Sequence, residues 1–493
     1  MTYSYSPELA PFLRELSQLI DGQKSVPTGA CPEASLDADG TTRDANTLEP
    51  LSPIVATSDA DVAKALSVAV SFHRQGEWAQ KTLTERQVVF DRLALELEKR
   101  GTLIGEADSI DIGAVGMFRG ISETLSPMVF RRSLIKMFAE CPAHRDVLNG
   151  DGQKIAYANW LPRGPAVVIC PTNAPIGSSM VQLGYAIQSG CPVIVKPSPW
   201  SAHSFNVVID AILAADIPAG LIQIVQGGAH VGKLLVDSPH VKSVCFTGSV
   251  AAGLGVAATC SKRLTPYVLE LGGANPFIVL QDADVEAAAR ALIASLSLVN
   301  GQYCCGGGRV LVHSDVRTAF LDAFTTQAAK IKLGHTQDKE TGTGPLCVGL
   351  ERPLKARIEE ILKAGATLLE CTPQPKGLAG TFMGPTLLLD PPTSLAPELF
   401  GPVATLNTFT TISEAVDLAQ MAESRLKGYV FGGADDAAEI MQGVQCAWWD
   451  HNCFQPDRPQ ARGDGFLGLC GYGELTPSVF MYEKYVSLVG ESK

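Results

Sequence analysis

The chain has 493 residues with a hydrophobic fraction of 46%, enough to form two or three domains with large apolar cores. Its net charge of −12, from 39 basic and 51 acidic residues without a basic cluster, argues against nucleic acid as a partner. No apolar run approaches the roughly 20 residues that span a bilayer, and the N-terminus lacks a basic and then apolar leader, so we expect no membrane partner and a cytoplasmic location.

The 13 cysteines are scattered, without Cys-x-x-Cys pairs or the Cys/His spacing of zinc sites. A chain of this length does not need disulfides for stability. The pattern therefore predicts reduced thiols, as in a cytosol, and no bound metal.

The first part of the chain begins with polar sequence and then turns helical. Residues up to about 50 are rich in Asp, Thr, Pro and Gly and are interpreted as an N-terminal arm. Apolar residues at helical spacing follow, and Thr84 with Gln87 fits a capping box. Helices are predicted over Pro7–Ile20, Asp59–Phe72, Val88–Lys99 and Glu123–Phe138.

From Pro165 onward, short apolar runs alternate with Ala- and Leu-rich segments, a pattern typical of parallel α/β sheets. The layout is one that nucleotide-binding domains use, and a second α/β series follows it, with the change next to Glu270–Gly273. Strands are predicted over Ala166–Cys170, Pro192–Val195, Leu221–Val225 and Val241–Phe246, and then over Pro276–Leu280, Val310–His313, Thr386–Leu389 and Tyr429–Phe431. The second series also contains helices predicted over Val285–Leu298 and Val316–Lys330.

The segment Val299–Arg309 carries the most chemical information, because it holds Cys304 in a Gly-rich turn. A thiol in such a turn can be reached by substrate, and backbone N–H groups beside it can donate to an oxyanion. A carboxylate, Glu270, precedes it in the run Leu269–Gly273. A nucleophile and a separate base suit two-stage acyl chemistry, because one attacks a carbonyl and the other activates water.

Several motifs together resemble the aldehyde dehydrogenase superfamily in order and spacing. They are Thr247-Gly248-Ser249, Leu269-Glu270-Leu271-Gly272-Gly273 with Asn275-Pro276, Gly301-Gln302 with Cys304 and Arg309, and Glu398-Leu399-Phe400-Gly401-Pro402-Val403. The resemblance covers roughly residue 50 to the C-terminus and is weakest after Asn452. Because it joins several long motifs, it is far more specific than a single glycine-rich fingerprint.

The resemblance implies NAD(P)-dependent oxidation of an aldehyde to a carboxylic acid. Cys304 would attack the aldehyde to form a thiohemiacetal, whose oxyanion the Cys304 backbone N–H and the Asn173 side-chain amide would stabilise. After hydride transfer to the nicotinamide, Glu270 would activate the water that hydrolyses the thioester. The alternatives are that Asn173 is a plain turn residue and that Glu270 is a capping or surface carboxylate.

The resemblance also implies a cofactor site. Lys196, at the end of a predicted strand, matches the family lysine that reaches the adenosine ribose. Gly248 and Ser249 open a helix whose N-terminal N–H groups suit a pyrophosphate. Glu398 matches the carboxylate that binds the nicotinamide ribose, and Phe400 lies beside it. The alternative for Lys196 is a solvated lysine at a strand end.

The sequence slightly favours NADP over NAD. Three positions after Lys196, many family members have a Glu that accepts a hydrogen bond from the adenosine 2′-hydroxyl and would repel a 2′-phosphate, but this chain has Pro199. Ser198, Ser201 and His203 are candidate donors to a 2′-phosphate, although no arginine lies beside them in the sequence. NAD remains the alternative cofactor.

Residues around the motif asparagine predict a roomy substrate entrance. Thr172 and Ala174 flank it where the family usually has aromatic residues, and Ser178 and Val181 follow where larger groups are common. We therefore expect the substrate to be a bulky or aromatic aldehyde.

Three further residues near the expected substrate site have open roles. Arg458 and Arg462 fall in the stretch that corresponds to the family's C-terminal substrate loop. Either could bind a substrate carboxylate, or both are solvated loop charges. Cys305, next to the nucleophile, is interpreted as a bystander rather than as a partner in a reversible disulfide.

The fold class implied is α/β and aldehyde dehydrogenase-like, with a Rossmann-like cofactor domain, a catalytic α/β domain and a small strand extension for oligomerisation. The expected divisions are an arm (1–50), a cofactor domain (51–138 and 160–270), a catalytic domain (271–465), and an extension with the C-terminal tail (139–159 and 466–493). Because the extension of the family binds a neighbouring subunit, a homodimer or homotetramer is expected.

Three other functions are weighed against aldehyde oxidation. A CoA-acylating semialdehyde dehydrogenase would pass the acyl group to CoA, but that class manages without the water-activating carboxylate that Glu270 provides. A cofactor-free thioester or ester hydrolase would use Cys304 and Glu270 but leave Lys196 and Glu398 without a role. A catalytically silent binding protein would have no need for these residues and Asn173 together.

Overall fold

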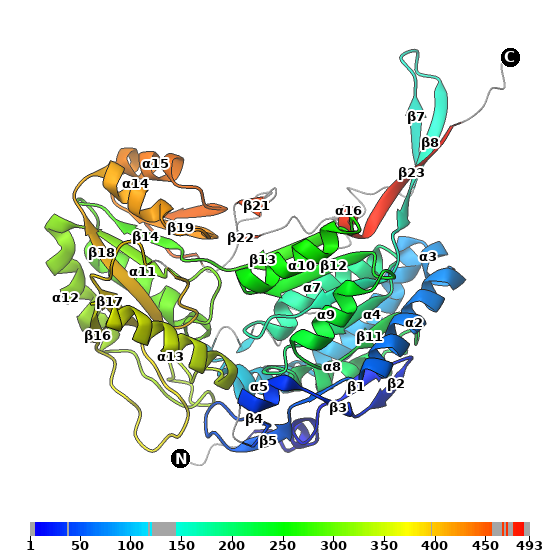
Figure 1. Cartoon of the computed structure of the whole chain (residues 1–493), viewed down its shortest axis with the longest axis horizontal. Coiled ribbons are helices and arrows are strands. Elements are labelled where there is room, and N and C mark those ends of the chain that lie inside the picture. The colour runs from blue at the N-terminus through cyan, green and yellow to red at the C-terminus, as the bar shows by residue number, and fades with distance from the viewer. Residues whose placement is uncertain are drawn as a thin grey trace.

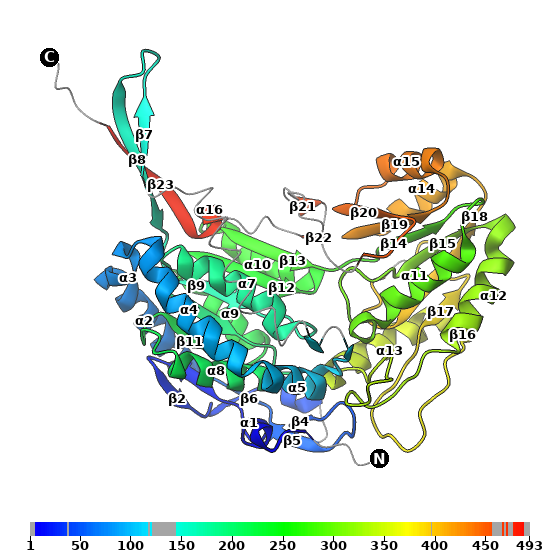
Figure 2. The ribbon, with the colours of Figure 1, turned by 180° about the vertical axis from the view of Figure 1, so that it is seen from behind.

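The computed structural model describes residues 5–36, 39–116, 119–120, 144–395, 397–455, 466–467, 470–471 and 477–487. It consists of two α/β units, each with a seven-stranded sheet, and a three-stranded ribbon that extends away from the first unit (Figures 1 and 2). The predicted α/β class is therefore confirmed. The predicted helix over Glu123–Phe138 lies outside the described residues.

The first sheet has the strand order β13-β12-β9-β10-β11-β1-β2. Its strands are β13 (Tyr267–Leu271), β12 (Ser243–Gly248), β9 (Ala166–Ile169), β10 (Val193–Lys196), β11 (Ile222–Ile224), β1 (Gln18–Ile20) and β2 (Gln23–Ser25). The first five strands of this order run parallel, whereas β1 and β2 are antiparallel additions at one edge. The four strands predicted between Pro165 and Phe246 are confirmed as β9 to β12.

Helices cover both faces of this sheet, as the alternation along β9 demonstrates. Ala166 and Val168 pack into a core with α4, α7 and α8, and Val167 and Ile169 pack into another with α2, α9 and α10. The helices of the first unit are α2 (Asp59–Gln75), α3 (Glu77–Gln80), α4 (Leu83–Lys99), α5 (Gly101–Ile112), α7 (Pro175–Gln188), α8 (His203–Ala214), α9 (Ala229–Asp237) and α10 (Val250–Ser261).

The residues before α2 pack against the first unit. Their elements are η1 (Pro7–Leu9), α1 (Ala10–Leu13), β1, β2, β3 (Gly29–Ala30), η2 (Pro32–Leu36), β4 (Thr41–Arg43), β5 (Pro50–Pro53) and β6 (Val55–Ala56). The helix predicted over Pro7–Ile20 is wrong beyond Leu13. Gln18–Ile20 is buried along its whole length and pairs with β11, with Leu19 opposite Ile224, so sheet pairing prevails over helical spacing there.

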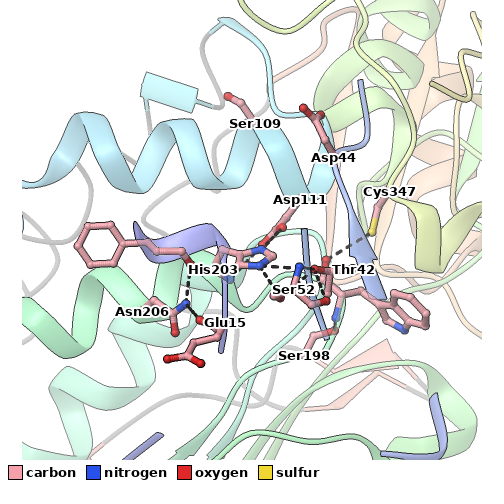
Figure 3. A network of polar contacts seen from close by, with 12 residues as sticks. Glu15, Thr42, Asp44, Ser52, Ser109, Asp111, Ser198, His203, Asn206 and Cys347 are labelled. Atoms are coloured by element: carbon pink, nitrogen blue, oxygen red, sulfur yellow. Dashed lines mark hydrogen bonds and ion pairs between the residues drawn. The ribbon is translucent and has the colours of Figure 1, made fainter. Parts of the chain in front are cut away.

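A buried polar network joins this N-terminal segment to α5 and α8 (Figure 3). His203 Nδ1 lies 2.6 Å from Asp111 Oδ1, and His203 Nε2 lies 2.9 Å from Ser52 Oγ. Thr42 Oγ1 lies 3.0 Å from Ser52 Oγ. The order of Ser, His and Asp is that of a hydrolytic triad, but Ser52 and His203 have no exposed surface. Because no substrate can reach them, the network has a structural role: it connects the N-terminal segment to α5 and α8.

The second sheet has the order β16-β17-β18-β15-β14-β19-β20 and is parallel except for β16. Its strands are β16 (Thr367–Glu370), β17 (Thr386–Leu389), β18 (Val403–Phe409), β15 (Arg309–His313), β14 (Pro276–Val279), β19 (Lys427–Phe431) and β20 (Trp448–His451). Its helices are α11 (Val285–Ser297), η3 (Leu298–Gly301), η4 (Ser314–Val316), α12 (Arg317–Ala328), α13 (Val348–Lys363), α14 (Ile412–Gln420) and α15 (Ala434–Gly443). All four predicted strands and both predicted helices of this series are confirmed.

The ribbon has the order β23-β8-β7 and is antiparallel. It consists of β23 (Met481–Ser487), β8 (Lys154–Pro162) and β7 (Arg145–Leu148), and both views place it beyond the helices of the first unit (Figures 1 and 2). The remaining elements are β21 (Phe466–Leu467), β22 (Cys470–Gly471) and α16 (Pro477–Phe480). No helix among the described residues has the length and apolarity required to cross a membrane.

Candidate active site

Cys304 lies in a turn between η3 and β15, closed by a hydrogen bond from the Gly306 N–H to the Tyr303 carbonyl at 2.9 Å. The three residues Val299, Asn300 and Gly301 precede it with φ angles of 50°, 57° and 73°. A β-branched residue such as Val299 rarely adopts this left-handed conformation, so the surrounding structure must hold it there.

Side-chain amides supply that support. The Asn300 Nδ2 donates to the carbonyls of Gly113 and Pro345, both at 2.8 Å. Gln302 accepts from the Cys347 N–H at 2.8 Å. Both amide side chains are fully buried. The turn that holds Cys304 is therefore hydrogen-bonded to the loop after α5 and to the segment before α13.

Asn275 holds the turn from the other side. Its Nδ2 donates to the carbonyls of Cys304 and Gly306 at 2.8 and 2.9 Å, and its Oδ1 accepts from the N–H groups of Leu426 and Lys427. The sequence included Asn275 in a motif without a role for it. Asn275 can brace the turn because its side-chain amide satisfies several main-chain groups at once, and nothing in the sequence alone distinguishes it from other Asn residues.

Asn173 lies between β9 and α7, where the strand ends and the helix begins. Its Nδ2 donates to the Gln302 carbonyl at 2.8 Å, and its side chain is partly exposed. The two residues are far apart in the sequence, and the fold brings the amide beside the turn that holds Cys304. The amide is bonded to a main-chain carbonyl two residues before Cys304.

Glu270 belongs to β13, opposite Thr247 of β12, and is partly exposed. It lies close enough to Cys304 for its negative charge to act on the thiol. The hydrogen bond with Cys305, burial, and the charges of Glu270 and Glu398 together raise the pKa of Cys304 well above its ordinary value. Cys304 is consequently a thiol in this structure, and it would need a base or a cation to become a thiolate.

Glu398 lies against the Gly272-Gly273 turn, where its Oε1 accepts from the Gly273 N–H at 3.1 Å. Burial raises the pKa of Glu398 to about 6, and the Gly273 hydrogen bond opposes this shift. The segment from Glu398 to Pro402 packs on the turn that holds Cys304, because a Cβ at Gly301 would lie 2.1 Å from the Pro402 nitrogen. Phe400, which lies between Glu398 and Pro402 in the sequence, is partly buried.

A pocket of about 600 Å³ opens beside the carboxyl ends of β9, β10 and β12, between α9 and α10. In an open α/β sheet this edge is where nucleotides bind. Lys196 lies in its wall and donates to the carbonyls of Pro197 and Gly227 at 2.7 and 2.6 Å. Burial lowers the pKa of Lys196. It is therefore a buried lysine, and the alternative of a solvated residue is wrong.

A second pocket of about 520 Å³ continues toward Glu398. Gly248 lines the first pocket and Ser249 the second, so the two meet at the start of α10. Ser249 is the N-cap of this helix, and its side chain accepts from the Ala252 N–H at 3.4 Å. Helix N-termini carry unpaired N–H groups and favour anions, so the junction suits a pyrophosphate.

The candidate donors for a 2′-phosphate do not all reach the first pocket. His203 is fully buried in the Asp111–Ser52 network, so its prediction as a donor is wrong. Ser201 is also fully buried and is not part of the pocket wall, whereas Ser198 is. Arg458 and Arg462 lie outside the described residues.

Within the described residues, no group of three or more His, Cys, Asp or Glu side chains is arranged to hold a metal ion. Sequence reasoning assigned no role to three charged residues, of which Lys427 and Asp450 are buried and Glu33 is partly exposed. Lys427 forms an ion pair of 2.7 Å with Asp450, and both side chains are buried. Glu33, from the N-terminal segment, lines the first pocket.

Comparison with known proteins agrees with this geometry. The profile described as the aldehyde dehydrogenase family matches residues 37–473. Geranial dehydrogenase from Castellaniella defragrans is 29% identical over 453 residues, which cover 90% of this chain and 94% of that protein. A (Z)-2-((N-methylformamido)methylene)-5-hydroxybutyrolactone dehydrogenase from Acinetobacter baylyi is 28% identical over 428 residues, covering 84% of this chain and 85% of that one.

Among solved structures, the NAD⁺ complex of an aldehyde dehydrogenase from Bacillus cereus covers 99% of both chains, with a TM-score of 0.85 and 23% identity. A NAD-dependent aldehyde dehydrogenase from Sinorhizobium meliloti gives a TM-score of 0.84 over 99% of this chain and 97% of that one, at 25% identity. The family profile spans most of the sequence and the folds coincide over nearly all of it. The chain belongs to the aldehyde dehydrogenase family of oxidoreductases.

Proposed function

We propose that the protein oxidises an aldehyde to a carboxylic acid, with Cys304 as the nucleophile. The thiolate adds to the carbonyl carbon and forms a C–S bond, and the Cys304 N–H and the Asn173 amide stabilise the resulting oxyanion. A bound NAD(P) would supply the acceptor for the hydride that leaves this carbon, and a thioester would then remain on Cys304. Glu270 takes a proton from water, and the hydroxide cleaves the C–S bond to release the acid.

The observation that carries this proposal is the meeting of three separate segments at one turn. Asn173 donates to Gln302, and Glu270 and Glu398 both act electrostatically on the Cys304 thiol. A hydrolase that works without a cofactor would need the thiol and one carboxylate, but neither the pocket beside Lys196 nor the pocket that Glu398 lines.

The residues present fit a dinucleotide. Lys196 would hold the adenosine ribose, the N–H groups at the start of α10 beside Ser249 would bind the pyrophosphate, and Glu398 would bind the nicotinamide ribose. The two pockets that meet between Gly248 and Ser249 are together large enough for an extended molecule of this kind.

We propose a bulky or aromatic aldehyde as substrate. Ala174, Ser178 and Val181 are small or medium-sized, partly exposed and close to Asn173 in the sequence, which supports a roomy substrate entrance. The relative from Castellaniella defragrans is named for geranial, which supports this class. A comparison of kcat/KM for a C2 aldehyde and an arylaldehyde tests the proposal, and a marked preference for the C2 compound would contradict it.

The catalytic roles are tested by two substitutions. Cys304→Ala should abolish turnover and leave cofactor binding intact, because only the nucleophile is lost. Glu270→Gln should release about one equivalent of reduced cofactor in a burst and then stall, because the thioester is no longer hydrolysed. Absorbance at 340 nm in stopped flow measures both. Wild-type steady turnover in either variant would contradict its assigned role.

We propose that the ribbon of β7, β8 and β23 is the oligomerisation extension, and that the first unit is the cofactor domain and the second the catalytic domain. Exposed Leu148, Ile155, Tyr482 and Tyr485 on this ribbon support a contact with a second subunit. Light scattering of the purified protein should give the mass of a homodimer or homotetramer, and a monomer at micromolar concentration would contradict the proposal. The cytoplasmic location stays a prediction.

A further inference from the structure

A carboxylate from the N-terminal segment reaches the wall of the first pocket. Glu33 belongs to η2, far from the sheet in sequence, yet it lines the same pocket as Lys196 and Pro199. The two charged side chains are near enough that each one shifts the pKa of the other. The pocket therefore places a carboxylate close to the lysine that the proposed function assigns to the adenosine ribose.

Two hydrogen bonds fix the Glu33 carboxylate at the start of α9. Its Oε1 accepts from the Ala229 N–H at 2.9 Å, and its Oε2 accepts from the Cys31 thiol at 3.0 Å. Burial alone would raise the pKa of Glu33, but these hydrogen bonds and the charge of Lys196 outweigh it and lower the pKa. The group is consequently ionised at neutral pH.

Gly228 makes room for this carboxylate. A Cβ at that position would lie 1.8 Å from Glu33 Oε1, so any other residue there would displace the side chain of Glu33. Gly228 is the N-cap residue of α9 and also lines the pocket. The position of the Glu33 carboxylate therefore requires a glycine at Gly228, although the two residues are distant in the chain.

A carboxylate with two bonds already made still has acceptor capacity, because its two oxygens offer about four lone-pair positions. The hydroxyls of an adenosine ribose are donors of the right kind, and a carboxylate beside a nucleotide ribose commonly accepts from its 2′-hydroxyl. The same negative charge opposes the 2′-phosphate of NADP. Pro199, at the position where many family members have such a carboxylate, has neither ability.

The geometry points to Glu33 as the residue that selects NAD over NADP in this chain, in place of the carboxylate missing at Pro199. This inference rests on the proposed function, because it needs the first pocket to bind the adenosine end of the cofactor. It reverses the slight preference for NADP that the sequence indicates from Pro199 alone. A carboxylate that only capped α9 would not influence which dinucleotide binds.

The experiment measures the Kd of NAD and of NADP for the full-length protein without any aldehyde. Trp200 lines the first pocket, so quenching of tryptophan fluorescence reports binding directly. Wild-type protein should bind NAD at least about tenfold more tightly than NADP. Glu33→Gln keeps the hydrogen-bond acceptor for Ala229 and removes the charge, so this preference should fall by about tenfold or more.

A matched control removes a carboxylate from the same N-terminal segment at an exposed position. Glu8→Gln should leave the ratio of the two Kd values within about twofold of wild type, because Glu8 is exposed in η1 and not part of the pocket wall. Circular dichroism should show the same secondary structure for both variants.

A second substitution tests whether a carboxylate introduced at Pro199 can take over the role of Glu33. Pro199→Glu in the Glu33→Gln background should restore the preference for NAD, whereas in wild type it should change the ratio by less than about threefold. A wild-type preference for NADP, or equal ratios in wild type and Glu33→Gln, would overturn the inference. Failure of the proposed aldehyde oxidation would appear separately, as intact dinucleotide binding without turnover of any aldehyde.

Discussion

The Cys304 thiol lies in surroundings that keep it protonated. Its Sγ lies 3.8 Å from the Cys305 Sγ, and two carboxylates act on it from nearby. A resting thiol resists adventitious oxidation, because the thiolate is the reactive form. The neighbouring Cys305 therefore affects the Cys304 thiol through its hydrogen bond, and the interpretation of Cys305 as a bystander to redox chemistry stays a prediction.

Cys305→Ala should lower the pKa of Cys304, because the hydrogen bond with Cys305 is the largest contribution that raises it. Alkylation of Cys304 by iodoacetamide at pH 7.5 should then be at least about threefold faster than in wild type. Peptide mass spectrometry measures the rate at this residue alone. Cys371→Ala, which removes another partly exposed cysteine, is the control and should leave that rate unchanged.

We expect cofactor binding to depend on pH because of the raised pKa of Glu398. Its pKa of about 6 means that the carboxylate becomes neutral as the pH falls through that value, and a neutral acid accepts hydrogen bonds from a ribose less well. The Kd of the cofactor should therefore rise below about pH 6 and stay flat between pH 7 and 8. In Glu398→Gln this step should vanish. A wild-type Kd that is constant from pH 5 to 8 would count against a role for Glu398.

Sequence reasoning identified the groups with intrinsic reactivity but missed those that act through position. Cys304 and Glu270 were recognisable from residue type and motif. The bracing by Asn275 and the pocket contact of Glu33 depend on approaches between segments far apart in the chain, for which one sequence carries no signal. Lys196 and His203 are both buried, but only Lys196 lines the first pocket, and this difference has no signal in the sequence.

At the scale of elements, interior strands were predictable and edge elements were not. The parallel strands β9 and β10 are buried throughout, so their sequences are continuous apolar runs. The strands β1 and β2 are short and carry polar residues, so they lack this signal. The capping box was also misplaced, because α4 begins at Leu83 and the observed box joins Thr82 and Glu85.

We expect His203 to stabilise the packing of the N-terminal segment on α5 and α8 through the buried network of Figure 3. His203→Ala would leave Asp111 and Ser52 without their buried partner, at a cost of about 3 kcal/mol in the free energy of unfolding. Calorimetry should show a Tm several degrees lower than that of wild type. His240→Ala, at an exposed position, should leave the Tm within about 1 °C, and an equal loss in both variants would contradict a special role for the network.

At the scale of the whole molecule, the site lies where the two α/β units meet. The first unit contributes Asn173, Lys196 and Glu270, and the second contributes Cys304 and Glu398. Each half was recognisable from its own motifs, and the order of the motifs indicated the family. Their convergence could not be derived from periodicity, because it depends on how the two sheets are joined after β13. The proposed chemistry requires both units together.

The central claim is that the substrate carbon becomes bonded to the sulfur of Cys304. The most direct test is mass spectrometry of Glu270→Gln, quenched with acid within seconds of mixing with an aldehyde and NAD(P). We predict an added mass equal to the acyl group, located on the peptide that contains Cys304, in about one equivalent per chain. An unmodified Cys304 while one equivalent of reduced cofactor has formed would contradict the account.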